Sequence, residues 1–257
     1  MKSSYSVIGL STGIIRPHDP FADRIIAAAE KDAGGFRDGD ILVLAETAVA
    51  TAEGHIVRLN SVTPSPRAEE LAKKHHMDPR TVEVVLAESD EIVGGIPGFL
   101  LCMKQGTLLP NAGVDASNAP PGCIVPLPAD PDKSAVRIRD EIYRSCHTKI
   151  GVIIADSRTH AMRLGCSGVA IGCTGITSVI DDRGRCDLFG HTLEVTKRAI
   201  ADNIASAAEL VMGEADECMP AAIIRGLGLP IGEEVGVDTI AADECLFMGV
   251  FARGRRE

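Results

Sequence analysis

The chain has 257 residues, of which 45% are hydrophobic and 3% aromatic, and it contains no tryptophan. This length and apolar content provide for a sizeable folded core and argue against a disordered chain. The 26 basic and 36 acidic side chains give a formal net charge of −10, which argues against a basic surface for nucleic acid. No apolar run approaches the roughly 20 residues that span a bilayer, and the first residues lack the apolar segment of a secretory signal. We therefore expect a cytoplasmic protein that binds neither nucleic acid nor membrane.

The predicted elements alternate between helices and strands. Several helix starts are marked by an aspartate or serine followed by proline, a pair that caps and opens a helix. Helices are predicted from Asp19–Pro20 to Gly34, from Ser65–Pro66 to His76, from Asp78–Pro79 to Ser89, from about Asp130–Pro131 through Cys146, and over 196–211. Buried strands are predicted over 41–45, 99–103 and 151–155. Because helices of constant length do not separate the strands, the pattern predicts an α+β fold in preference to a doubly wound sheet or barrel.

The eight cysteines include no Cys-x-x-Cys pair. In a cytoplasmic protein this favours reduced, buried thiols over disulfides or a zinc site. The doublet His75–His76 follows two lysines on a predicted helix, so we expect it on a solvated face.

Three acidic segments stand where structure alone rarely requires them. Asp115 lies in a loop of small and amide side chains, Asp156 follows the apolar segment 151–155, and Glu214 follows Gly213 at a predicted helix end. The carboxyl end of a helix already carries partial negative charge, so an acid there is unfavourable unless a cation offsets it. A turn or cap role remains open for each residue. The alternative is a shared site for Mg²⁺ or Mn²⁺, which prefer oxygen ligands and also bind phosphates.

A glycine-rich segment, 165–175, follows Arg158 and Arg163, and two further arginines, Arg183 and Arg185, occur in a turn-rich stretch. Closely spaced glycines let a backbone approach a ligand, and arginines bind carboxylate or phosphate. The same pattern also fits a tightly packed pair of strands with ordinary surface arginines.

Taken in order, these segments resemble a known family. The motifs are Asn111-Ala-Gly-Val-Asp-Ala-Ser-Asn118, Ala155-Asp-Ser157, Arg163-x-Gly-x-x-Gly-x-Ala-Ile-Gly172, Arg183-Gly-Arg-x-Asp-Leu-Phe-Gly190, Leu193-Glu-Val-Thr196, Leu210-Val-Met-Gly-Glu-Ala-Asp-Glu217 and Arg225-Gly-Leu227. Together they are similar to the coenzyme F-420:L-glutamate ligase family, also called F-420-0:gamma-glutamyl ligase. The resemblance covers about residues 8–227, and we treat residues 1–257 as a single unit of this kind.

The resemblance implies an enzyme that uses GTP to join L-glutamate to the deazaflavin coenzyme F-420 precursor, and then adds a glutamate through a gamma linkage. The implied fold is an unusual α+β arrangement of two entwined subdomains in a homodimer. The implied cofactors are Mg²⁺ or Mn²⁺ and K⁺. The implied partners are the F-420 precursor, L-glutamate and GTP.

The resemblance also implies the site residues. The metal ligands would be Asp115, Asp156, Ser157 and Glu214. The nucleotide would contact Thr12, Gly13, Ile14, Ile15, Glu46, Thr47, Thr51, Asn118, Met212, Gly213, Ala215, Asp216, Glu217, Cys218 and Met219. Beside these, we select Arg158, Arg163, Arg183 and Arg185 as candidates for holding phosphates or glutamate carboxylates during catalysis.

The sequence departs from the family pattern at several positions, two of them beside the predicted nucleotide site. Thr51 stands where the family usually has a lysine, and Glu46 stands where a neutral or basic residue is usual. Two alternatives therefore stay open: a paralogous nucleotide-dependent ligase for another carboxylate, and a non-catalytic protein that binds nucleotide or deazaflavin.

Overall fold

The computed structural model describes residues 4–254, which form two compact units. The first unit comprises residues up to 56, 117–119 and 127–237, and the second comprises 57–116, 120–126 and the residues from 238 onward. The chain therefore passes between the units several times. Within the described residues, no helix combines the length and the apolar character needed to cross a membrane.

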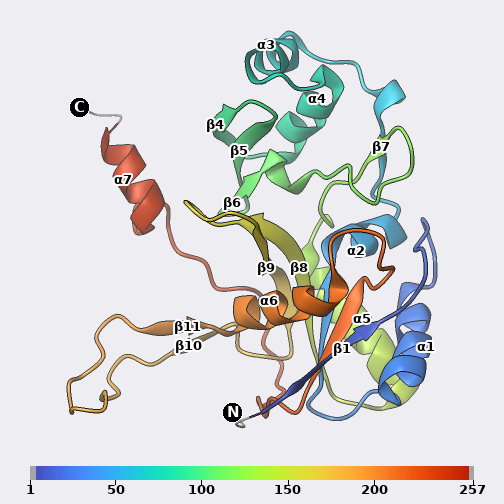
Figure 1. Ribbon diagram of the computed structural model, residues 1–257, viewed down its shortest axis with the longest axis vertical. Coiled ribbons are helices and arrows are strands. Elements are labelled where there is room, and N and C mark those ends of the chain that lie inside the picture. Colours follow the sequence, from blue (N-terminus) through green and yellow to red (C-terminus); the bar gives the residue numbers. More distant parts are fainter. Residues whose placement is uncertain (1–3, 255–257) are drawn as a thin grey trace. The chain divides into compact units, whose positions relative to one another are not determined.

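A mixed five-stranded sheet is the centre of the first unit (Figure 1). Its strands, in spatial order, are β1 (Ser6–Leu10), β12 (Ala221–Arg225), β2 (Ile41–Ala45), β8 (Gly151–Thr159) and β9 (Cys166–Thr174). Only β2 and β8 are parallel, and the other neighbours are antiparallel. The mixed sheet agrees with the predicted α+β class.

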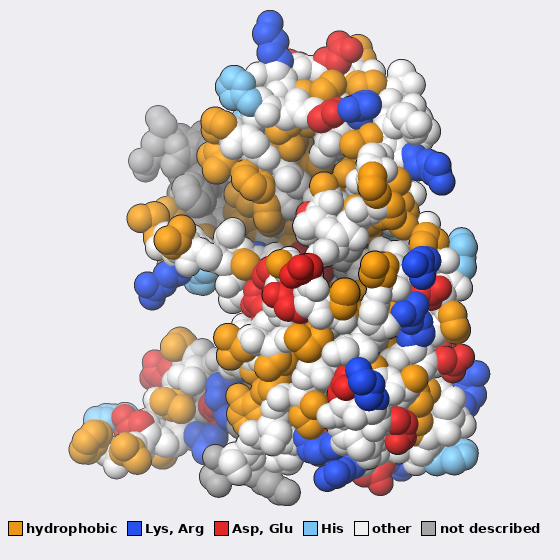
Figure 2. Space-filling view, turned by 45° about the vertical axis from the view of Figure 1, so that its right-hand side comes forward, with side chains coloured by type: hydrophobic (Ala, Val, Ile, Leu, Met, Phe, Trp, Pro, Cys, Tyr) orange, Lys and Arg blue, Asp and Glu red, His pale blue; other side chains and the backbone are white. Residues whose placement is uncertain are grey.

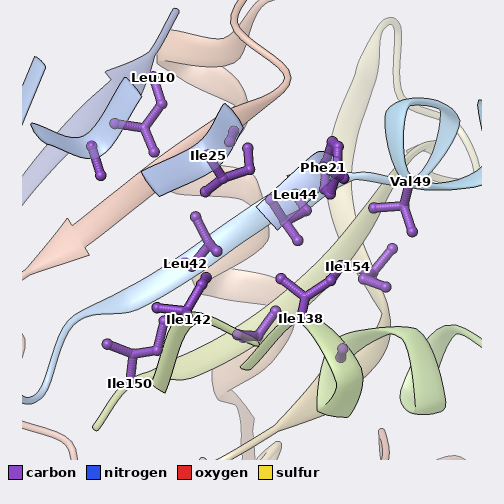
Figure 3. Packing of buried hydrophobic residues seen from close by; sticks show 14 of the residues in the cluster. Leu10, Phe21, Ile25, Leu42, Leu44, Val49, Ile138, Ile142, Ile150 and Ile154 are labelled. Atoms are coloured by element: carbon purple, nitrogen blue, oxygen red, sulfur yellow. The ribbon is translucent and has the colours of Figure 1, made fainter. Parts of the chain in front are cut away.

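Helices cover both faces of this sheet, and each face has its own core. On one face, α1 (Phe21–Ala33), α2 (Glu46–Ala52) and α5 (Pro131–Cys146) pack over side chains such as Leu42, Leu44 and Ile154, as Figure 3 shows. On the other face, α6 (Ile200–Met212) packs over residues such as Ile153 and Ala170. The central strands β2 and β8 have continuous apolar sequences over 41–45 and 151–155 because both faces of the sheet are buried there.

A buried ion pair joins three elements of the first unit. Arg225 at the end of β12 makes two bonds to the Asp40 carboxylate, at 3.0 and 2.7 Å. The same guanidinium donates to the carbonyl oxygens of Ala33 and Gly35 at the end of α1. Asp40 is only 1% exposed. Arg225, which belongs to the motif Arg225-Gly-Leu227, therefore has a structural role: it neutralises a buried carboxylate and donates hydrogen bonds to carbonyls at the end of a helix.

An extended hairpin also belongs to the first unit. Strands β10 (Val179–Asp181) and β11 (Lys197–Ala199) pair antiparallel, and residues 182–196 between them form an arm that reaches away from the sheet (Figure 1).

The second unit contains α3 (Pro66–His75), α4 (Pro79–Glu88), a three-stranded antiparallel sheet and a short strand pair. The sheet consists of β4 (Glu91–Ile96), β5 (Phe99–Lys104) and β6 (Thr107–Pro110), and the pair of β3 (Val57–Arg58) and β7 (Cys123–Ile124). Short 3-10 turns cover Leu59–Ser61 and Asn111–Gly113, and α7 spans Leu246–Gly254. The core contains Leu71, Val85 and Leu100.

The helix predicted over 196–211 begins only at Ile200, because residues 197–199 pair with β10 as a strand. Three further local predictions were wrong. Pro20, not Asp19, is the residue before the first helix, because the Asp19 carboxylate binds the Arg16 amide and the Arg24 guanidinium instead. His75 is buried, since it continues the inward-facing positions 68, 71 and 72 of α3, whereas His76 ends the helix in a left-handed conformation.

The third wrong prediction concerns the cysteines. All eight are free, as expected, but only Cys102 and Cys173 are buried, whereas Cys166, Cys186 and Cys218 are exposed. Three thiols therefore lie at the surface instead of filling the core.

Candidate functional site

The first part of the candidate site is the end of β8. This strand continues to Thr159, beyond the predicted end at 155, and carries Asp156 and Ser157. The burial pattern changes at this point: residues 151–155 are buried, and Ser157 is exposed. Asp156 and Ser157 therefore lie where a core strand emerges from the fold.

Glu214 meets these residues from the carboxyl end of α6. Gly213 ends the helix with a φ of 71°, and Glu214 follows within hydrogen-bond reach of Ser157. Burial, the hydrogen bond with Glu209, the charge of Glu209 and the charge of Asp156 together raise the pKa of Glu214 to about 7. The hydrogen bond with Ser157 acts in the opposite direction. The carboxylates thus crowd negative charge at a helix end that already disfavours it.

Two residues that the sequence analysis did not select complete this cluster. Cys166 on β9 and Glu209 on α6 bring their ligating atoms to within 4.8 Å of each other and of a Glu214 oxygen. Burial, with the charges of Glu214 and Glu209, raises the pKa of the Cys166 thiol. Glu209 could have been found in the sequence, since it is an acid in the last turn of the helix that Glu214 follows. Nothing in the sequence alone indicates Cys166.

Tight packing of α6 on β9 creates this juxtaposition. A Cβ at Gly168 would lie 2.5 Å from the Ala205 carbonyl oxygen, so only glycine permits this approach. The Ser206 hydroxyl donates to the Gly168 carbonyl at 2.7 Å, and the Asp202 carboxylate accepts from the Ala170 amide at 3.0 Å. Cys166 lies two residues before Gly168. Because strand side chains alternate between faces, both residues lie on the face of β9 that α6 covers.

The glycine-rich segment is therefore a packing motif at these positions. Gly168 is in contact with α6, and a Cβ at Gly172 would lie 2.6 Å from the Pro131 backbone at the start of α5. A bulge at Ile171 shifts the register between β8 and β9, and Gly172 pairs with Ile154. The sequence allowed either a ligand-binding loop or a tightly packed pair of strands. Gly168 and Gly172 fit the packed pair of strands.

Asp115 belongs to the second unit, whereas Asp156, Ser157 and Glu214 belong to the first. Its backbone forms a two-way bridge with Val125, with N–O distances of 3.0 and 2.8 Å. Asn111 of the same motif has a structural role, because its side-chain oxygen accepts from the Leu100 amide. That Asp115 shares ions with the other acids stays a prediction.

The segments predicted to contact a nucleotide adjoin one another within the first unit. The Thr12 amide donates to the Cys218 carbonyl at 3.3 Å, and the His18 amide donates to the Ala52 carbonyl at 2.9 Å. These bonds connect the loop after β1 to the 212–219 segment and to α2. Asn118 is in the same unit and has a left-handed φ of 52°.

The individual side chains of these segments differ in access. Gly13, Ile14, Gly213, Ala215, Asp216, Glu217 and Cys218 are exposed, whereas Thr12, Ile15, Glu46, Thr47, Met212 and Met219 are half-buried. The Thr47 hydroxyl donates to the Glu46 carboxylate, and the Glu217 carboxylate accepts from the Ala215 amide. Thr51 is 6% exposed and presents almost no surface to a ligand in this structure.

The four candidate arginines fall into two groups. Arg183 and Arg185 lie at the base of the arm, where they form ion pairs with Asp181 and Asp182. The hydrogen bonds from Arg183 lower the pKa of Asp181 to about 2. Arg158 is half-buried on β8, and Arg163 is exposed in the turn after this strand. These two arginines are closer in sequence to Asp156 than Arg183 and Arg185 are.

The donor set fits a divalent cation. Two carboxylates, Asp156 and Glu214, act on each other electrostatically, and the Ser157 hydroxyl bonds to one of them. Oxygen ligands of this kind are those that Mg²⁺ and Mn²⁺ prefer. A bound cation would remove the repulsion that raises the pKa of Glu214.

Comparison with known proteins identifies the family of this chain. Residues 9–226 match the family model described as F420-0:Gamma-glutamyl ligase. The chain is 45% identical over 214 residues to the coenzyme F420:L-glutamate ligase of Methanopyrus kandleri, with 83% of each chain covered. It is 41% identical over 223 residues to the ligase of the same name from Methanothermobacter thermautotrophicus, covering 86% of this chain and 88% of that one. A third ligase of this name, from Methanocaldococcus jannaschii, is 45% identical over 210 residues, covering 81% and 84%. The chain therefore belongs to the F420-0:gamma-glutamyl ligase family.

Proposed function

We propose that this chain is a GTP-dependent ligase that adds L-glutamate to the coenzyme F-420 precursor, F-420-0. It forms an amide and then a gamma-glutamyl linkage, with release of GDP and phosphate. Family membership and the names of the relatives support glutamate ligation on F-420. The observation that carries the proposal for this chain is the cluster of Asp156, Ser157 and Glu214 in the same unit as the predicted nucleotide segments.

The proposed reaction has two steps. A carboxylate oxygen of the acceptor attacks the γ-phosphorus of GTP, the bond to the β-phosphate oxygen breaks, and GDP leaves. The glutamate amine then attacks the carbonyl carbon of the acyl phosphate. The new C–N bond forms as phosphate departs with the C–O bonding electrons, and the nitrogen loses a proton to solvent.

The proposed roles of the residues follow from their placement. Asp156, Ser157, Glu214 and Asp115 hold Mg²⁺ or Mn²⁺, which when bound neutralises phosphate charge and orients the γ-phosphoryl group. Loop 12–15, Asn118 and the 212–219 segment hold the nucleotide, and K⁺ acts with the divalent ions. Arg158 and Arg163 orient phosphate or carboxylate groups. The four proposed metal ligands and the arginines thus position reactants and neutralise charge, and no side-chain nucleophile takes part.

The proposed assembly is a homodimer that works in the cytoplasm on small-molecule substrates. The arm supports it: Leu188 and Phe189 near its tip are 97% and 87% exposed, and Val195 is 85% exposed. Figure 2 shows hydrophobic side chains on this projecting arm. Large apolar side chains gathered in this way are typical of surfaces that a partner covers.

A second candidate function is a ligase of the same mechanism that uses a different carboxylate acceptor. The observation that favours it is Thr51, which is buried where the family usually has a lysine.

The test is product analysis by mass spectrometry with F-420-0, L-glutamate and Mn²⁺, comparing GTP with ATP. We expect phosphate release that requires both F-420-0 and glutamate, and a mass increase of one glutamyl residue and then another. Asp156→Asn should lower this rate at least about a hundred-fold, since it removes a charged ligand. Release only with another acceptor would favour the second candidate, and nucleotide binding without turnover would contradict both.

A further inference from the structure

Cys166, Glu209 and Glu214 form a mixed cluster of one thiol and two carboxylates in the first unit. Their ligating atoms come from β9, the last turn of α6 and the second residue after that helix, and all lie within 4.8 Å of one another. Three ligands around a tetrahedral zinc ion are about 3.6 Å apart, given bonds of about 2.1–2.3 Å. Closing the observed separations to this value needs side-chain movements of only about 1 Å.

The cluster combines a soft ligand with hard ones. A cysteine sulfur favours ions such as Zn²⁺ and Co²⁺, whereas oxygen ligands alone favour Mg²⁺ and Mn²⁺. The two glutamates hydrogen-bond to each other, so their carboxylates lie close enough to share a cation. The thiol beside them gives that cation a sulfur ligand.

We propose that Cys166 Sγ and the carboxylates of Glu209 and Glu214 bind a thiophilic divalent cation such as Zn²⁺ or Co²⁺. Three protein ligands leave a fourth position for water or a substrate oxygen. The proposal rests in part on the proposed function, because Glu214 also belongs to the predicted magnesium site. A thiophilic ion bound here therefore competes with Mg²⁺ or Mn²⁺ for one ligand.

The test is titration of the metal-free protein with Co²⁺, without nucleotide or other substrates, followed by absorption spectroscopy. A cobalt–thiolate bond produces a charge-transfer band in the near ultraviolet, so we expect this band to saturate at one Co²⁺ per chain. Cys166→Ser should abolish the band. Glu209→Gln should weaken Co²⁺ affinity about 10- to 100-fold, because it removes a charged group from the ion.

Matched variants separate this effect from general changes in charge or thiol content. Cys186→Ser removes another exposed cysteine of the first unit, and Glu194→Gln removes an exposed acid of that unit outside the cluster. Both should bind Co²⁺ like the unmodified protein. Absence of the band in the unmodified protein, or its persistence in Cys166→Ser, would overturn the proposal. The measurement involves no turnover, so the ligase proposal can fail while this one holds, and the reverse.

Discussion

At the scale of single residues, Glu214 shows how the fold concentrates charge. It follows the carboxyl end of α6 and lies beside Glu209, Ser157 and Asp156. Burial and these acidic neighbours raise its pKa to about 7, whereas an ordinary glutamate titrates near 4.5. Without a cation, and between about pH 4.5 and 7, Glu214 therefore keeps a proton in the folded protein that it loses in the unfolded chain.

This difference predicts a pH dependence of stability in metal-free buffer. Below about pH 4.5 Glu214 is protonated in both states, so it has no effect. As pH rises from about 4.5 to 7, the unfolded chain ionises first, and the folded state loses stability until Glu214 ionises in both states. Thermal unfolding should therefore show that the melting temperature of Glu214→Gln increases relative to that of the unmodified protein over this range. An equal response of both proteins to pH would contradict the raised pKa, and added Mn²⁺ should stabilise the unmodified protein more than the variant.

At the scale of elements, the contact of α6 with β9 determines the geometry of the acidic cluster. Gly168 lets the helix backbone approach the strand, and the bonds of Ser206 and Asp202 fix its position. Glu209 and Glu214 lie at the end of this helix, and Cys166 lies on this strand. The distance between helix and strand therefore decides whether the three ligands converge.

Gly168→Ala tests this dependence. The added Cβ would lie 2.5 Å from the Ala205 carbonyl, so helix and strand must separate, at an expected cost of about 1–3 kcal/mol in the free energy of unfolding. Urea denaturation measures this cost. Gly94→Ala is the control, since no atom lies within 4 Å of a Cβ there, and it should change stability by less than about 0.5 kcal/mol. A loss of stability in the control as large as in Gly168→Ala would contradict the packing explanation.

At the scale of the whole molecule, a net charge of −10 must be reconciled with the proposed triphosphate substrate. A protein of this charge repels polyanions at long range, so the proposed cations at the acidic cluster supply the attraction locally.

The arm of residues 182–196 raises a second whole-molecule question. Its exposed Leu188 and Phe189 are costly to leave in water unless another surface covers them.

The arm leads to a prediction about assembly. If it packs on a second copy, the unmodified protein should sediment at twice the chain mass of 27.0 kDa. Leu188→Asp combined with Phe189→Asp should shift it toward the single-chain mass, because charged side chains cannot be buried there without a large cost. Analytical ultracentrifugation distinguishes these masses, and circular dichroism checks that the variant is folded. A single-chain mass for the unmodified protein would contradict the dimer proposal.

The sequence predicted helices and strands best where local signals agree. Ser65–Pro66 and Asp78–Pro79 open α3 and α4 as predicted, with the Ser65 and Asp78 side chains accepting from amides of the first turn. The prediction failed at Asp19 and His75, where a tertiary contact or a buried helix face prevailed over the local pattern. Local capping and spacing rules cannot anticipate such contacts, because they involve residues outside the local window.

For the candidate site, the sequence alone selected Asp156, because it follows a buried strand, and Glu214, because an acid at the carboxyl end of a helix is electrostatically unfavourable. It also identified the family, because the ordered motifs are local strings of residues. Only the tertiary structure decided that Cys166 and Glu209 join Glu214, and that Gly168 and Gly172 serve packing. Both depend on the separation between a helix and a strand, which is set by side chains meeting across the core and is not recorded in any one segment of the chain.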